Sequence, residues 1–261
     1  MNDSDLGDWR IKAVTRLAKD IPEAYLGGPS HKAGTPVYLS TLTKDLQGNY
    51  VSFITPHPTA LALNIAHQAG LLVKELRRRL RYNKTATPYG SGKAINIEDL
   101  STLYDYFEQC MIAITFSFQA IETYANDIIA NLITTEYILQ RGDKEITCTS
   151  DELQRVASTE EKIGVILPSI LNLPSPKQSK FWRYFKELKR VRDSTIHLKS
   201  QDAYNRLNID KESLFFQFIQ LRAERFSWHA LDIIAYFIDN NSPPRWYINS
   251  KRVIFDSPAN R

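Results

Sequence analysis

Arg192 and His197 are the two side chains whose types and spacing could together perform chemistry. A histidine can transfer protons near neutral pH because its ordinary pKa lies there. An arginine binds phosphate well because its planar guanidinium reaches two oxygens at once. RNA can be cleaved without a metal when the ribose 2′-hydroxyl loses a proton, the leaving oxygen gains one, and a cation stabilises the charge on phosphorus. We therefore examine His197 as the proton-transfer group and Arg192 as the phosphate ligand.

Both residues lie at the end of a segment that is predicted to form an amphipathic helix, residues 181–199. Apolar residues recur there at steps of three and four, which is typical of one buried helical face. Residues 177–199 also contain eight Lys or Arg against two acidic residues. This cationic face, which includes Lys189 and Arg190, is expected to meet an anion such as an RNA backbone.

Five positions on a regular helix separate Arg192 and His197 by about 140°. They converge on one face only if the helix ends or kinks between them, for which Ser194 and Thr195 are suited. The alternative is structural: Arg192 forms an ion pair with Asp193 or Glu187, and His197 is a capping or core residue.

Glu122 and Asn126 lie one turn apart on a long apolar helix, so they share a face. Inward-facing polar groups on such a helix are costly without partners. Arg192 and His197 are the predicted partners, with Asp193 and Ser194 assisting.

The Arg192-Asp193-x-x-x-His197 pattern resembles the R-x4-6-H motif of the HEPN superfamily, all-helical domains of which many are metal-independent ribonucleases. Family members often carry an E-x3-K/R/N pair on the neighbouring helix, which Glu122 and Asn126 match. Many have Asn after the Arg, and the Asp found here is a variant that the family also shows. The order of helices over residues 97–238 is similar to the HEPN arrangement.

The resemblance implies a homodimeric endoribonuclease that needs no cofactor and leaves a 2′,3′-cyclic phosphate. It further implies a toxin-like role in stress response or phage defence, with an antitoxin or regulatory partner. The alternative is a non-catalytic HEPN-like module for RNA or anion binding or for dimerisation. A helical interaction protein unrelated to this family is a third interpretation.

A second basic run, residues 74–84, holds six cations against Glu75. It is interpreted either as a platform for the RNA backbone, with tyrosines available for stacking, or as a solvated helix end. In the first interpretation Arg77, Arg78, Arg79 and Arg81 bind RNA, and the tyrosines are Tyr82 and Tyr89. The following Gly90-Ser91-Gly92-Lys93 fails the spacing of a phosphate-binding loop.

The composition is that of an ordinary globular protein: 261 residues, 43% hydrophobic, 24% charged, net charge +4. Cys110 and Cys148 do not suggest a disulfide scaffold, and two Cys with five scattered His are too few for a metal site. His31, His57, His67 and His229 are interpreted as structural. The acidic N-terminus and the absence of a long apolar run predict a cytoplasmic protein without a membrane span.

We expect a mainly all-α bundle with a small N-terminal β-hairpin. Residues 1–96 are predicted to hold a helix over 8–25, a hairpin over 37–54 and a basic helix over 59–82, followed by a loop over 83–94. Residues 97–240 form the HEPN-like core, with helices over 97–139, from the Ser158-x-x-Glu161 capping box, over 181–199 and over 210–238. Residues 241–261 are expected to form an extended arm or a strand.

Overall fold

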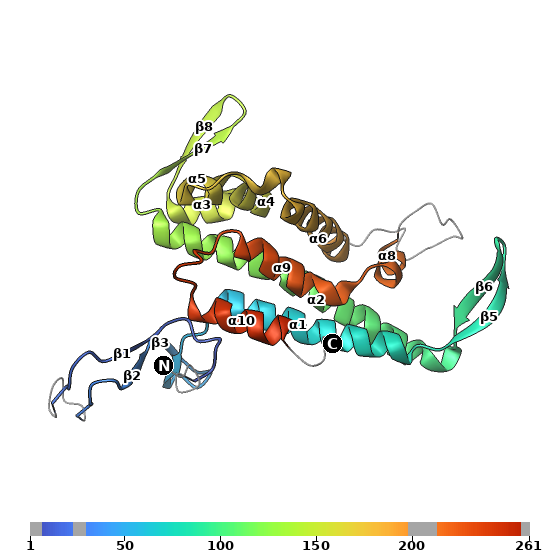
Figure 1. The fold of residues 1–261 in the computed structure, drawn as a ribbon, viewed down its shortest axis with the longest axis horizontal. Coiled ribbons are helices and arrows are strands. Elements are labelled where there is room, and N and C mark those ends of the chain that lie inside the picture. The colour runs from blue at the N-terminus through green and yellow to red at the C-terminus, as the bar shows by residue number, and fades with distance from the viewer. Residues whose placement is uncertain (1–6, 23–29, 198–212, 257–261) are drawn as a thin grey trace.

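The computed structural model describes residues 7–22, 30–197 and 213–256, and helices dominate it (Figure 1). Two long antiparallel helices, α1 (Pro58–Arg79) and α2 (Leu100–Leu132), pack along their lengths. Helices α6 (Lys180–Ile196), α9 (Phe226–Ala235) and α10 (Arg245–Phe255) complete the bundle. The mainly helical prediction is therefore confirmed.

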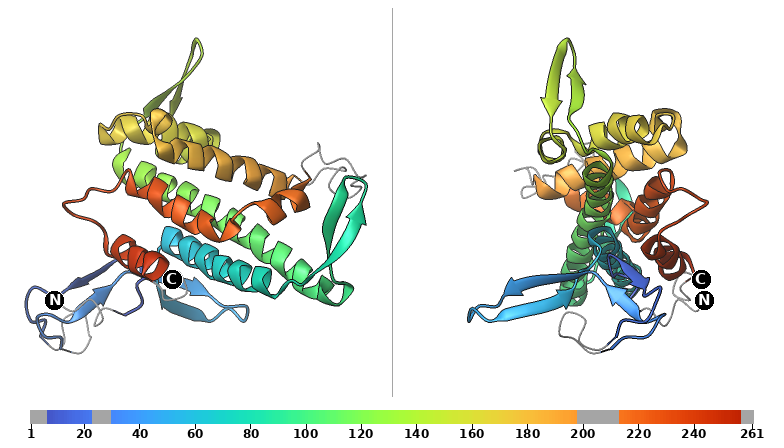
Figure 2. Two further views of the ribbon diagram at one scale, coloured as in Figure 1. Left: turned by 45° about the vertical axis from the view of Figure 1, so that its right-hand side comes forward. Right: turned by 90° about the vertical axis from the view of Figure 1, so that its left-hand side faces the viewer.

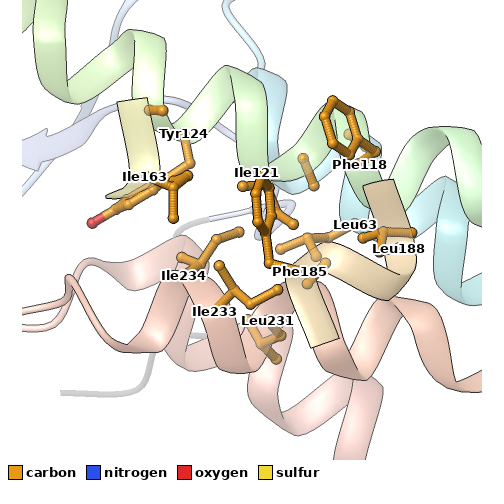
Figure 3. Close-up of a cluster of buried hydrophobic side chains, with 14 of the residues drawn as sticks. Leu63, Phe118, Ile121, Tyr124, Ile163, Phe185, Leu188, Leu231, Ile233 and Ile234 are labelled. Atoms are coloured by element: carbon orange, nitrogen blue, oxygen red, sulfur yellow. The ribbon is translucent and has the colours of Figure 1, made fainter. Parts of the chain in front are cut away.

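Helix α2 is the centre of the bundle because it contacts α1, α6 and α9. Its Ile114, Phe118 and Ile121 are buried, as expected for a helix that is apolar around most of its circumference. Phe185 and Leu188 of α6 point toward Ile121 and toward the apolar side chains of α9 (Figure 3). The core therefore fixes how α6 lies against α2.

A chain of short helices covers the end of α2 and leads into α6. It begins with α3 (Ser150–Val156) and α4 (Thr159–Glu161) and continues through a π-helical turn, η4 (Lys162–Ile166), into α5 (Leu167–Leu171) and the 3₁₀ turn η5 (Pro176–Gln178). The predicted capping box is confirmed: Ser158 Oγ accepts a hydrogen bond from Glu161 N, and the Glu161 carboxylate accepts one from Ser158 N.

The described residues also form four two-stranded antiparallel sheets. Strands β1 (Val14–Arg16) and β2 (Pro36–Tyr38) lie beside the hairpin of β3 (Ser40–Lys44) and β4 (Tyr50–Ile54). The other two are the hairpins β5 (Tyr82–Thr87)–β6 (Gly90–Ile95), between α1 and α2, and β7 (Tyr137–Arg141)–β8 (Lys144–Cys148), between α2 and α3. Both of these project away from the helices (Figures 1 and 2).

The helix predicted over residues 8–25 is wrong for the described part, residues 7–22. That segment is extended because its backbone pairs with residues distant in sequence: Lys12 N donates to Thr55 O and Leu17 N to Thr35 O. The predicted N-terminal hairpin is present, but its first strand begins at Ser40.

The loop predicted over residues 83–94 is also wrong, because its glycines lie in a hairpin rather than in irregular chain. Gly90 has a φ of 112°, which glycine adopts without strain, and it follows the tight turn after Thr87. The helix predicted to reach residue 139 ends at Leu132. The Arg141-Gly142-Asp143 sequence forms the β7–β8 turn, where Gly142 has a φ of 60°.

The long helix predicted over residues 210–238 is interrupted. The structure has α8 (Leu214–Gln220), a 3₁₀ turn η6 (Ala223–Arg225) and then α9. The Arg77 guanidinium donates to the carbonyl oxygens of Phe218 and Leu221, which supplies a partner where the helix ends. The extended C-terminal arm is a further correction, since residues Arg245–Phe255 form α10 after the Pro243-Pro244 pair.

None of the helices among the described residues combines the length and the apolar character needed to cross a lipid bilayer.

Candidate functional site

Helix α6 positions the candidate site at its C-terminal end. Ser179 caps the other end by accepting a hydrogen bond from Trp182 N. Phe185, Leu188 and Val191 are buried against the bundle, and α6 runs antiparallel to α2 (Figures 1 and 2). Successive turns of α6 therefore meet progressively earlier turns of α2.

Arg192 is held in a partly buried position, with 21% of its side chain exposed. Its guanidinium carbon lies 3.8 Å from the centroid of the Phe118 ring, and its Nη1 lies 3.0 Å from Asp193 Oδ1. Its Nε is buried and has no hydrogen-bond partner among the described residues. The guanidinium is thus partly neutralised by a carboxylate, and only its exposed fifth is accessible to an external anion.

Asp193 connects Arg192 to a wider charge network. Lys189 Nζ lies 3.3 Å from Asp193 Oδ2 and 3.8 Å from Glu160 Oε2. Lys186 also pairs with Glu160, at 2.9 Å. The cationic face of α6 is therefore partly neutralised within the chain, and Lys189 does not stand as an isolated RNA contact.

His197 is the C-cap of α6, and its side chain is exposed. Its backbone N–H donates to Asp193 O at 3.0 Å. Ser194 and Thr195 donate their hydroxyl protons to the carbonyls of Arg190 and Val191 within the last turns of the helix. The helix ends at Ile196, between Arg192 and His197, and the backbone of His197 is no longer helical, with a φ of −109° and a ψ of 67°.

Arg192 pairs with Asp193, and His197 occupies the C-cap position, as the structural alternative describes. No hydrogen bond or ion pair among the described residues joins the Arg192 and His197 side chains.

No hydrogen bond or ion pair among the described residues joins Glu122 or Asn126 to Arg192 or His197. Phe118, one turn earlier in α2, contacts Arg192. Asn126 Oδ1 is buried and has no hydrogen-bond partner in the described residues.

The partner of Glu122 is Lys162, whose side chain is only 1% exposed. Lys162 Nζ lies 3.9 Å from Glu122 Oε1 and donates to Gln154 O at 2.7 Å. Burial lowers the pKa of Lys162, and Glu122 and Glu161 oppose that effect. The sequence-based prediction did not include Lys162 as the partner of Glu122. The sequence indicates it only as a single cation at the start of the apolar run Ile163-Gly164-Val165-Ile166.

The basic run of α1 divides into structural and exposed cations. The Arg77 guanidinium donates to Tyr106 Oη at 2.5 Å as well as to the α8 carbonyls, so it is a bundle residue and not a free RNA ligand. Arg79 pairs with Glu75, and Arg81 binds Asp99 Oδ1 at 2.8 Å. Arg78 is exposed. On α6, Arg190 Nη1 donates to Gln217 Oε1 at 2.8 Å.

Two histidines that were interpreted as structural, the buried His57 and the half-buried His229, stack on aromatic rings of the bundle. His57 is 4% exposed and stacks on Trp246 with ring centroids 4.6 Å apart. Its Nε2 lies 3.9 Å from Asp127, which also pairs with Lys12 at 3.4 Å. Burial lowers the pKa of His57 to about 4, with Asp127 opposing. His229 stacks on Tyr184 at 4.2 Å, and burial lowers its pKa to about 4.

Both cysteines are buried free thiols. The described residues contain no group of three or more His, Cys, Asp or Glu placed to hold a metal ion. No family model, curated protein or solved structure matches the chain.

Proposed function

We propose that this chain is a HEPN-type endoribonuclease whose active site forms between two copies. The observation that carries the proposal is the end of α6. There an arginine held by Phe118 and Asp193 remains partly exposed, and an exposed histidine ends the same helix. The mainly helical bundle and the R-x4-6-H spacing support it.

In the proposed reaction the ribose 2′-oxygen attacks phosphorus while the bond from phosphorus to the 5′-oxygen breaks. His197 takes the 2′-hydroxyl proton or supplies a proton to the leaving 5′-oxygen. Arg192 stabilises the charge that develops on the phosphate oxygens. Asp193 holds Arg192 in place. The products are a 2′,3′-cyclic phosphate and a 5′-hydroxyl.

The first experiment measures RNA cleavage in excess EDTA by the wild type, Arg192→Ala and His197→Ala. We expect each substitution to slow cleavage by about 100-fold or more. Arg183→Ala and His31→Ala are matched controls, because both side chains are exposed and lie away from the Arg192 cluster. Cleavage that survives in His197→Ala, or that EDTA abolishes, would contradict the proposal.

The second experiment tests whether the site is shared. A heterodimer of Arg192→Ala and His197→Ala contains one site with neither substitution, so an equal mixture should recover about a quarter of wild-type activity. A mixture as inactive as its components would show that both residues act within one copy or that no dimer forms.

The alternative function is a non-catalytic module that binds RNA or another anion through the same surface. The observation that favours it is the Arg192–Asp193 ion pair, which offsets the charge of the arginine in the unbound chain. Intact RNA together with Arg192-dependent binding would establish this alternative.

A further inference from the structure

The β5–β6 hairpin is a projecting arm that the helical bundle does not cover (Figures 1 and 2). Residues 82–91 are exposed, so neither face is buried along most of its length. The arm is held at its base, where Asn96 N donates to Arg81 O at 3.2 Å and Arg81 binds Asp99. An isolated two-stranded hairpin is only marginally stable, so a ligand that binds the exposed strands would stabilise the arm.

The pairing register places two lysines against one another. Lys84 is directly opposite Lys93, and Tyr82 lies on the same face because it is two residues from Lys84. Like charges directly opposite across a pair of strands destabilise the pairing. Residues 82–95 contain no acidic side chain that could relieve this repulsion.

The carboxylates near the base of the arm already form ion pairs with arginines. Glu75 pairs with Arg79, and Glu98 and Asp99 pair with Arg81. Arg78, Lys84 and Lys93 are exposed, and none of the acidic side chains among the described residues forms an ion pair with them. The two lysines on the arm and Arg78 in the last turn of α1 give this end of the bundle a positive charge that is complementary to an external polyanion.

Exposed aromatics lie at both ends of the arm. Tyr82 at the base is 46% exposed, and Tyr89 at the tip is 64% exposed. Between them, a hollow of about 440 Å³ is lined by Lys84, Thr85 and Ser91 among others. Cations that follow a phosphate backbone and aromatic rings on which bases stack are the combination that binds single-stranded nucleic acid.

We infer that the β5–β6 hairpin is a binding arm for single-stranded RNA. Lys84, Lys93 and Arg78 contact successive phosphates, and Tyr82 and Tyr89 stack on bases. The choice of RNA over other polyanions rests on the proposed function.

The test is fluorescence anisotropy with a labelled single-stranded 20-nucleotide oligouridylate over a range of salt concentrations. All proteins carry His197→Ala so that the probe stays intact. Relative to that background, Lys84→Ala with Lys93→Ala should weaken binding about tenfold and reduce the slope of log affinity against log salt by about 1.4. Tyr89→Ala should weaken binding with the slope unchanged, because stacking releases no counterions.

The matched control is Lys44→Ala with Lys144→Ala, which removes the same charge from exposed positions on β3–β4 and β7–β8. Binding by Lys84→Ala with Lys93→Ala that equals binding by this control would overturn the inference. It is also overturned if the lysines are needed for binding to phosphatidylserine vesicles or to polyglutamate but not to the RNA. Circular dichroism melting verifies that each variant is folded.

The outcome for the arm is separable from the outcome for the nuclease. If RNA binding depends on Lys84 and Lys93 but the protein with His197 intact does not cleave RNA, the inference about the arm is supported and the nuclease proposal is wrong. If the protein with His197 intact cleaves RNA but the lysine substitutions leave RNA binding unchanged, the inference about the arm is wrong and the nuclease proposal is supported.

Discussion

Arg192 and Phe118 join α6 to α2 through a cation–π contact, with the guanidinium carbon 3.8 Å from the ring centroid. Phe118 is 2% exposed and also stacks on Phe185, at 6.1 Å between centroids. The ring that packs the core therefore also orients the arginine proposed to bind phosphate. This relationship makes Phe118 a positioning residue that touches no RNA.

We predict that Arg192 and Phe118 are energetically coupled. In a double-mutant cycle with Arg192→Met and Phe118→Leu, the coupling free energy should be about 0.5–2 kcal/mol in favour of the native pair. Urea unfolding of the wild type, both single variants and the double variant measures it. Strictly additive effects would show that the contact contributes nothing to stability.

Glu122→Gln should destabilise the fold by about 1 kcal/mol, because it removes the carboxylate that faces the buried Lys162 cation. The value is modest because Glu122 is 41% exposed and solvent screens the pair. The rate of RNA cleavage should not change, since the ion pair of Glu122 is with Lys162 and not with Arg192. Loss of cleavage at unchanged stability would restore the catalytic role predicted from the sequence.

Arg77 and Arg78 are adjacent in sequence, but substituting them should change the free energy of unfolding by very different amounts. Arg77→Met should cost about 3 kcal/mol, since Tyr106 Oη and the α8 carbonyls lose their donor. Arg78→Met should change stability by less than about 0.5 kcal/mol, because the side chain is exposed. Chemical denaturation compares the two, and equal losses would contradict the structure.

Stability should fall as pH decreases from about 6.5 toward 4, because the pKa values of His57 and His229 are lowered to about 4 in the folded chain. Between those values the unfolded chain binds more protons, so acid favours unfolding. Each histidine contributes up to about 1.4 kcal/mol per pH unit. Urea unfolding between pH 5 and 7 should show a shallower dependence in His229→Phe than in the wild type. An identical dependence in both would exclude His229 as a source.

The sequence predicts the helices with strong apolar periodicity, such as α1, α2 and α6, and the capped helix start at Ser158. It fails where distant residues decide the local structure. Residues 14–16 form a strand because 36–38 pair with them, and α8 is separated from α9 where Arg77 binds its end. The sequence around each of these segments does not show the distant residues that pair with it.

The candidate site divides in the same way. The Arg192–Asp193 pair is between neighbours and was foreseen as an alternative. The choice of Phe118 over Glu122 as the residue that meets Arg192 depends on how α6 lies along α2, which the packing of Phe185 and Leu188 determines. Helical spacing alone does not carry that information.

The base of the β5–β6 arm, where Asn96 N donates to Arg81 O, allows the length of the arm to vary. Because the strands are joined at that point, the residues beyond it can be trimmed or lengthened without moving the end of α1 relative to the start of α2, and doubling the loop adds only about 0.6 kcal/mol of closure cost. The reach of the arm is thus adjustable independently of the helical body that carries it.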